Sequence, residues 1–215
     1  MESVAAPILK SRNIRRLIFA SHDNQLVSAF RAVIEPCGIE VMSLTDVGLP
    51  EPSGSTRGTL DSATRKAAVV AAITNTPASG YARGFYIDPL LRWGGGGPKW
   101  AWPIPWPYKI EDLAAELRKA DHQLGGQGYC GPDDRGAYFR TLLCIVWPDA
   151  QSLTFEGRIP GQFITRGRRN KPRDLVYYFV PDGETAPVAL LADEARQHFS
   201  DQEQAFEAFR KALSA

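Results

Sequence analysis

Hydrophobic positions change their period several times along the first third of the chain, and each change predicts an element. A short continuous apolar run at residues 17–20 is typical of a buried strand. Ser21 or Asp23 can then cap a helix, whose apolar residues recur at helical spacing: Leu26, Phe30, Val33 and Ile34. Gly38 ends this helix, and residues 39–42 return to a strand pattern. A strand, a helix and a strand in this order predict a parallel crossover.

The same reasoning predicts further elements in the rest of the chain. In chain order they are a helix near residues 59–73, a loop at 75–80, a strand at 81–87, a helix at 110–120, a strand pair at 137–147 and 152–159, a strand at 176–180, and a last helix capped near Ser200 and Asp201. The pair is expected to be antiparallel, because only a short turn, which contains Pro148 and Asp149, joins the two strands. Residues 1–215 are therefore expected to form one domain, with residues 1–13 as a loose N-terminal arm.

Composition changes this picture little. The formal net charge is +1, which provides no bulk electrostatic signal for binding nucleic acid. No apolar run approaches the roughly 20 residues that a membrane span needs, and the N-terminus lacks the apolar core of a signal peptide. The cysteines (Cys37, Cys130 and Cys144) are odd in number and show no paired spacing. Reduced thiols in a cytoplasmic protein fit this better than disulfides or a zinc site.

Five segments, in the right order and at the right spacing, carry a resemblance to a known family. They are residues 17–24, 61–67, 135–139, 155–164 and 178–181. On these segments the chain resembles the inosine-triphosphate pyrophosphatase family over nearly its whole length. The resemblance implies an α/β fold, with an elongated mixed sheet flanked by helices, two lobes and a central cleft. It also implies a homodimer, and magnesium-assisted attack of water on a nucleoside triphosphate, which leaves a monophosphate and pyrophosphate.

The resemblance implies a phosphate-binding turn at Ser21, His22, Asp23 and Asn24, directly after the first strand. Ser21 keeps a hydroxyl, and a helix start offers free backbone N–H groups to a phosphate. The family's asparagine is replaced by Asp23, however, and its lysine falls at Leu26. A carboxylate repels a triphosphate and leucine carries no charge. The alternative is that Ser21 and Asp23 act as plain helix caps.

Two carboxylates are candidates for the metal-binding and catalytic role that the resemblance implies. Asp61 stands where the family has a glutamate, and its side chain is one methylene shorter. Asp88 ends a predicted strand, which is where α/β folds place ligands. Alignment by length would instead put Arg83 and Gly84 at this position, and Asp88 can equally be a turn residue before proline.

Cations elsewhere in the chain could replace the missing lysine. The candidates are Lys66 and the basic residues of the 166–173 loop, Arg168, Arg169, Lys171 and Arg173. Such side chains can hold phosphates through charge-assisted hydrogen bonds, but the loop can equally be a solvated surface. The family's purine-reading Ser-His-Arg is replaced by Ser200, Asp201 and Gln202, and His198 nearby is expected to be an exposed histidine.

Tryptophans alternate with prolines between residues 100 and 108, a pattern foreign to the family. Trp100, Trp102 and Trp106 could stack on a base, form a dimer contact, or pack against one another in a compact loop.

Two hypotheses about function follow from this pattern. One is a divergent nucleotide pyrophosphatase that uses Mg²⁺. The other is a family member without hydrolysis that acts as a nucleotide-binding or protein-interaction module. A third possibility is a pocket that has been re-used for a different ligand.

Overall fold

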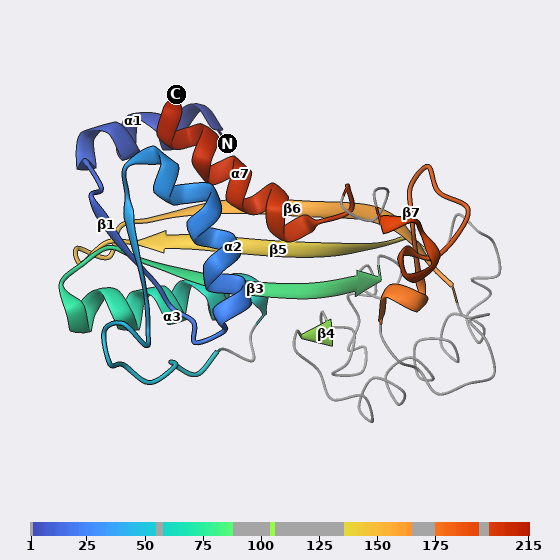
Figure 1. Cartoon of the computed structure of the whole chain (residues 1–215), viewed down its shortest axis with the longest axis horizontal. Coiled ribbons are helices and arrows are strands. Elements are labelled where there is room, and N and C mark those ends of the chain that lie inside the picture. Colours follow the sequence, from blue (N-terminus) through green and yellow to red (C-terminus); the bar gives the residue numbers. More distant parts are fainter. Residues whose placement is uncertain (1, 55–57, 88–103, 106–135, 165–174, 194–197) are drawn as a thin grey trace, which may run out of the picture. The chain divides into compact units, whose positions relative to one another are not determined.

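The computed structural model describes residues 2–54, 58–87, 104–105, 136–164, 175–193 and 198–215 (Figure 1). The strands are β1 (Arg16–Phe19), β2 (Glu40–Ser43), β3 (Ala78–Ile87), β4 (Ile104–Pro105), β5 (Gly136–Val146), β6 (Ser152–Phe163) and β7 (Phe179–Pro181). They form one mixed sheet in the order β2-β1-β3-β5-β6-β7, with β4 paired to β3. The helices are α1 (Glu2–Arg12), α2 (Asn24–Ile34), α3 (Thr59–Thr74) and α7 (Asp201–Ser214), with short 3₁₀ turns η1 (Glu35–Cys37), η3 (Leu175–Tyr177) and η4 (Val188–Leu190). The predicted α/β class is confirmed.

The predicted crossover from β1 through α2 to β2 is confirmed. Strands β1 and β2 pair in parallel, with Leu17 opposite Val41 and Phe19 opposite Ser43. After the exposed Arg16, the residues Leu17, Ile18 and Phe19 of β1 are buried on both faces of the sheet, which is why this run is continuously apolar. Helix α2 ends at Ile34 and continues as the 3₁₀ turn η1, after which Gly38 has φ +79°, a left-handed conformation that glycine adopts without strain.

The chain divides into two compact units, and strands β3, β5 and β6 each contribute residues to both of them. The first unit comprises Met1–Arg83, Thr141–Gly157 and Gln202–Ala215, and the second comprises Gly84–Arg140 and Arg158–Asp201. That all 215 residues make one domain stays a prediction.

In the first unit, helices α2 and α7 pack on one face of the sheet and α3 packs on the other (Figure 1). Phe30 of α2 stacks on Phe19 of β1, with ring centroids 4.5 Å apart, and Phe206 of α7 meets Phe30 edge-on at 5.0 Å. On the opposite face, Ile18 packs against Val70 and Ala71 of α3. Alternate residues of β1 therefore face different helices, as strand geometry requires.

The second unit has its own aromatic core. Phe85, Phe139, Phe163 and Phe179 are each 3% exposed or less, and Phe139 and Phe179 meet edge-on at 5.0 Å. These rings come from β3, β5, β6 and β7. Aromatic pairs in this geometry stabilise a core beyond the area they bury.

Three boundaries differ from the sequence-based predictions. Strand β3 begins at Ala78 rather than residue 81, because Ala78 and Ser79 pair with Ile18 and Phe19 of β1. The strand expected at 176–180 is instead η3 followed by β7. The expected N-terminal arm takes the form of helix α1, which places Leu9 in the core at 4% exposure.

Other elements agree with the sequence. The hairpin of β5 and β6 is confirmed, and its turn is closed by the N–H of Trp147, which donates to the carbonyl of Gln151 at 2.9 Å. The predicted last helix is present as α7, which buries Ala205, Phe206 and Phe209. The predicted helix at 110–120 lies outside the described residues. In the part of the chain that the structure describes, no helix has the length and hydropathy to span a bilayer.

Candidate functional site

The carboxyl ends of the parallel strands β1 and β2 meet at one edge of the sheet, which is where α/β folds bind ligands. The N–H of Leu44, after β2, donates to the carbonyl of Ser21, after β1, at 3.3 Å. The N–H of Ala20 donates to the carbonyl of Ser79 in β3 at 2.8 Å. The sequence-predicted phosphate turn therefore lies beside the loop that follows β2, and β3 pairs with β1 on the side away from β2.

The turn after β1 is closed by its own side chains. The Asp23 carboxylate accepts hydrogen bonds from the N–H groups of Gln25 and Leu26 at 2.9 and 3.1 Å. The Asp23 N–H in turn donates to the Ser21 hydroxyl oxygen at 3.1 Å, and Ser21 is 7% exposed. The capping interpretation of Asp23 is thus confirmed. Backbone donors that could have met a phosphate are occupied by a carboxylate of the chain itself.

Replacing Asp23 by alanine is expected to lower the free energy of unfolding by about 1 kcal/mol, because two amides at the start of α2 lose their acceptor. Asparagine caps helices about as well as aspartate, so Asp23→Asn is expected to leave stability close to that of the wild type. Urea unfolding followed by circular dichroism measures both changes. Equal midpoints for the two variants would show that the cap does not act as described.

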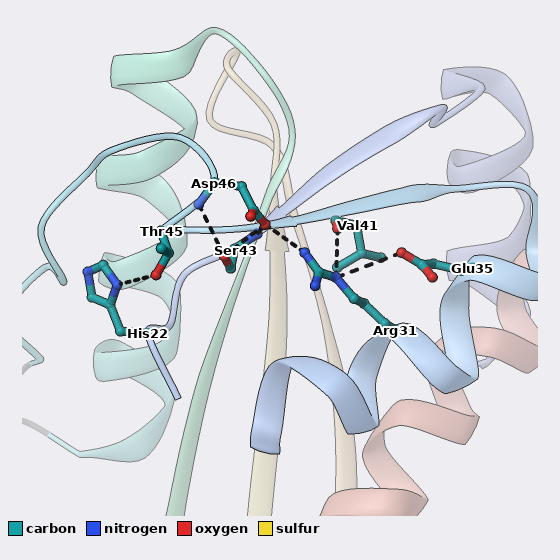
Figure 2. A network of polar contacts seen from close by, with 7 residues as sticks. All are labelled: His22, Arg31, Glu35, Val41, Ser43, Thr45 and Asp46. Atoms are coloured by element: carbon teal, nitrogen blue, oxygen red, sulfur yellow. Dashed lines mark hydrogen bonds and ion pairs between the residues drawn. The ribbon is translucent and has the colours of Figure 1, made fainter. Parts of the chain in front are cut away.

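A second polar network holds the loop after β2 (Figure 2). The Asp46 carboxylate accepts from the N–H and hydroxyl of Ser43 at 2.7 and 2.8 Å, and pairs with the Arg31 guanidinium at 2.6 Å. The Arg31 Nε donates to the carbonyl of Val41 at 3.0 Å. The hydrogen bonds from Ser43, and then the charge of Arg31, lower the pKa of Asp46. Because this pKa is lowered in the folded state, the contribution of the carboxylate to stability is present above its ordinary pKa and is lost as the pH falls through the lowered one.

The network reaches the phosphate turn through one further contact. The His22 Nδ1 lies 3.0 Å from the Thr45 hydroxyl, and both side chains are exposed (Figure 2). Arg31 also approaches Glu35 at 3.8 Å.

The residue pattern of the sequence did not single out Arg31, Thr45 or Asp46. The one local signal was an aspartate three residues after Ser43, a spacing at which the two side chains can close a turn.

Helix α3 carries two of the sequence-predicted site residues. Asp61 lies in its first turn and is exposed, while Lys66 pairs with Glu51 at 2.7 Å. The helix approaches β3 closely at Gly80, where a Cβ would come 1.9 Å from the carbonyl oxygen of Ala63. Only glycine allows this approach, and the position of α3 against the sheet depends on it.

The family resemblance implies a magnesium site, and the described residues contain part of its predicted ligand set. Among them, no group of three or more histidine, cysteine, aspartate or glutamate side chains lies close enough together to hold a metal ion. Asp61 is described and Asp88 is not, so their predicted association stays a prediction.

Several other predicted residues lie outside the described part of the chain. They are Trp100, Trp102 and Trp106, and the basic residues Arg168, Arg169, Lys171 and Arg173. Where the family reads the purine, Gln202 accepts a hydrogen bond from the Tyr81 hydroxyl at 3.4 Å. His198 is exposed, as the sequence predicted.

Known proteins share both the sequence pattern and the fold of this chain. The model of the Ham1 family matches residues 17–212. The dITP/XTP pyrophosphatase of Brucella melitensis is 30% identical over 171 residues, which cover 78% of this chain and 76% of that protein. The dITP/XTP pyrophosphatase of Gluconobacter oxydans is 26% identical over 195 residues, with 90% and 88% covered.

Solved structures agree on the fold. The Ham1 protein of Staphylococcus aureus superposes with a TM-score of 0.69 at 16% identity, covering 93% of this chain and 98% of that one. The Ham1 protein of Coxiella burnetii superposes with a TM-score of 0.70, also at 16% identity, covering 94% and 99%.

Proposed function

Because the chain belongs to the Ham1 family, we propose that it is a nucleotide pyrophosphatase, which cleaves a nucleoside triphosphate to a monophosphate and pyrophosphate. The observation that carries this proposal is the 30% identity to a dITP/XTP pyrophosphatase over three quarters of both chains. The substrates expected from that relative are deaminated purine nucleoside triphosphates.

The geometry supports a phosphate site at the carboxyl edge of β1 and β2. Catalysis of phosphoryl transfer depends mainly on positioning and on stabilisation of charge. The exposed side chains of His22 and Asn24 are polar groups that this turn offers to a phosphate, and the Ser21 hydroxyl, 7% exposed, lies beside them. On helix α3, Lys66 adds a cation.

The same geometry indicates a lower affinity for the triphosphate than a turn with asparagine and lysine would give. Asp23 places a negative charge beside the phosphate position, and its carboxylate already occupies the amides of Gln25 and Leu26. Leu26 lies in the first turn of α2 and brings no charge. We therefore expect modest affinity for the triphosphate rather than a different class of reaction.

A panel of nucleotides tests the proposal. Purified protein is incubated with dITP, ITP, XTP, ATP and GTP, with and without divalent metals, and released pyrophosphate is measured. Pyrophosphate is expected from deaminated purines ahead of ATP and GTP. Lys66→Met is expected to lower kcat/KM by about tenfold or more, because a charge-assisted contact is lost. Arg65→Met removes a neighbouring exposed cation on α3 and is the matched control.

A second candidate function is nucleotide binding without hydrolysis. The capped turn around Asp23 is the observation that favours it, because the donors that would stabilise a reacting phosphate are occupied. In this case nucleotides raise the melting temperature by mass action, while no nucleotide in the panel releases pyrophosphate. Such a result would replace the pyrophosphatase proposal. A homodimer, implied by the family resemblance, remains a proposal that the mass of the protein in solution tests.

A further inference from the structure

Lys66, a candidate for binding phosphate, forms an ion pair with the carboxylate of Glu51, which comes from another segment of the chain. We propose that Glu51 is an affinity-determining residue, which competes with the phosphates of a polyphosphate ligand for the ammonium group of Lys66. This inference rests on the proposed function, since it concerns the same ligand class. It adds a residue that the family resemblance and the sequence pattern did not single out.

The contact itself is short and partly shielded. The Lys66 Nζ lies 2.7 Å from Glu51 Oε1, and the two side chains are 20% and 41% exposed. Lys66 is thus the more enclosed partner, although most lysines reach into solvent. A lysine ammonium is a compact point charge, and a carboxylate at this distance attracts it directly.

A second observation places the loop of Glu51 against the helix independently of the ion pair. A Cβ on Gly54 would lie 2.6 Å from the Ser62 hydroxyl oxygen and 3.8 Å from Lys66 Cε. The backbone at Gly54 therefore lies directly over this side of α3. The loop lies against the stem of Lys66 while Glu51 binds its ammonium group, so a phosphate that approaches the ammonium competes with the carboxylate.

Glu51 differs from Asp23 in what its removal would change. Asp23 binds backbone amides, so its loss weakens a helix cap. Glu51 instead accepts a hydrogen bond from a side-chain cation fifteen positions away. Neutralising Glu51 therefore frees a cation at little structural cost, because partly exposed ion pairs contribute only about 0–1 kcal/mol.

Inorganic pyrophosphate is the probe that tests the proposal, with its affinity measured by calorimetry at fixed ionic strength and without added metal. Glu51→Gln is expected to tighten pyrophosphate binding by about two- to fivefold, the range that up to about 1 kcal/mol allows. In the double variant Glu51→Gln with Lys66→Met, this gain is expected to disappear. Glu40→Gln is the matched control, because Glu40 forms a comparable pair with Arg16 at 2.8 Å, with both side chains 56% exposed.

Each outcome decides the proposal. Tighter binding in Glu51→Gln alone supports it. Unchanged or weaker binding overturns it, as does a gain that persists without Lys66, or the absence of pyrophosphate binding in both the wild type and Glu51→Gln. Pyrophosphate affinity is independent of turnover, so hydrolysis in the nucleotide panel with no effect of Glu51→Gln would defeat this inference alone. An effect of Glu51→Gln without hydrolysis would defeat only the pyrophosphatase proposal.

Discussion

A variant in which Phe30 is replaced by alanine is expected to lose about 3–5 kcal/mol of its free energy of unfolding. Phe30 is 0% exposed and lies between two elements that are remote in sequence. Its ring stacks on Phe19 at 4.5 Å and meets Phe206 and Phe209 at 5.0 and 6.3 Å. Truncation removes the transfer free energy of the ring and leaves a cavity that rigid neighbours fill only in part.

Urea unfolding measures this loss, with Ser28→Ala as the control on an exposed position of the same helix. The control is expected to change stability by less than about 0.5 kcal/mol. A loss below about 1 kcal/mol in Phe30→Ala would contradict the aromatic cluster as the centre of the first unit. The cluster also supports the candidate site, because α2 begins at the phosphate turn.

Replacing Gly80 by alanine is expected to destabilise the protein by about 3 kcal/mol, at the upper end of what overpacking usually costs. The new Cβ would lie 1.9 Å from the carbonyl oxygen of Ala63 and 2.9 Å from the backbone nitrogen of Ala67. Backbone atoms cannot rotate away as a flexible side chain can, so α3 must move. Lys66 and Asp61 move with the helix, and nucleotide affinity is expected to fall together with stability.

Gly48→Ala separates this effect from a general intolerance of glycine substitution. Gly48 has φ +66°, and a Cβ added there would meet no atom within 4 Å, so alanine costs only the left-handed backbone strain of about 1–2 kcal/mol. The two variants are compared by urea unfolding and by thermal shift with nucleotide. If Gly48→Ala proved as destabilising as Gly80→Ala, the contact with α3 would not explain the loss of stability in Gly80→Ala.

Elements with a strong local signal could be predicted from the sequence. The run at residues 17–20, the helical spacing after it, and the stop at Gly38 all describe interactions within a few residues. The sequence predicts strand β3 three residues late, because the small residues Ala78, Ser79 and Gly80 do not favour a strand by themselves. Ala78 and Ser79 adopt the strand conformation because they pair with β1. The run at 176–180 is β-prone, yet the chain turns first as η3, which local propensity did not reveal.

The candidate site divides in the same way. The cap by Asp23 is local, reaching two and three residues along the chain, and the sequence allowed it to be proposed. The pairs of Arg31 with Asp46 and of Lys66 with Glu51 each join residues fifteen positions apart. No periodicity or spacing rule connects such residues, because their proximity depends on how the loops return to the helices.

The sequence by itself determined the chemistry of the turn after β1: a hydroxyl at Ser21, a carboxylate at Asp23 and no cation at Leu26. The tertiary structure decided which groups remain available there. It showed the carboxylate bound to the start of α2 and Lys66 held by Glu51, and it placed the turn beside the loop after β2. The physical reason is that residue type fixes what a group can bind, whereas packing over long sequence distances fixes which partner it meets.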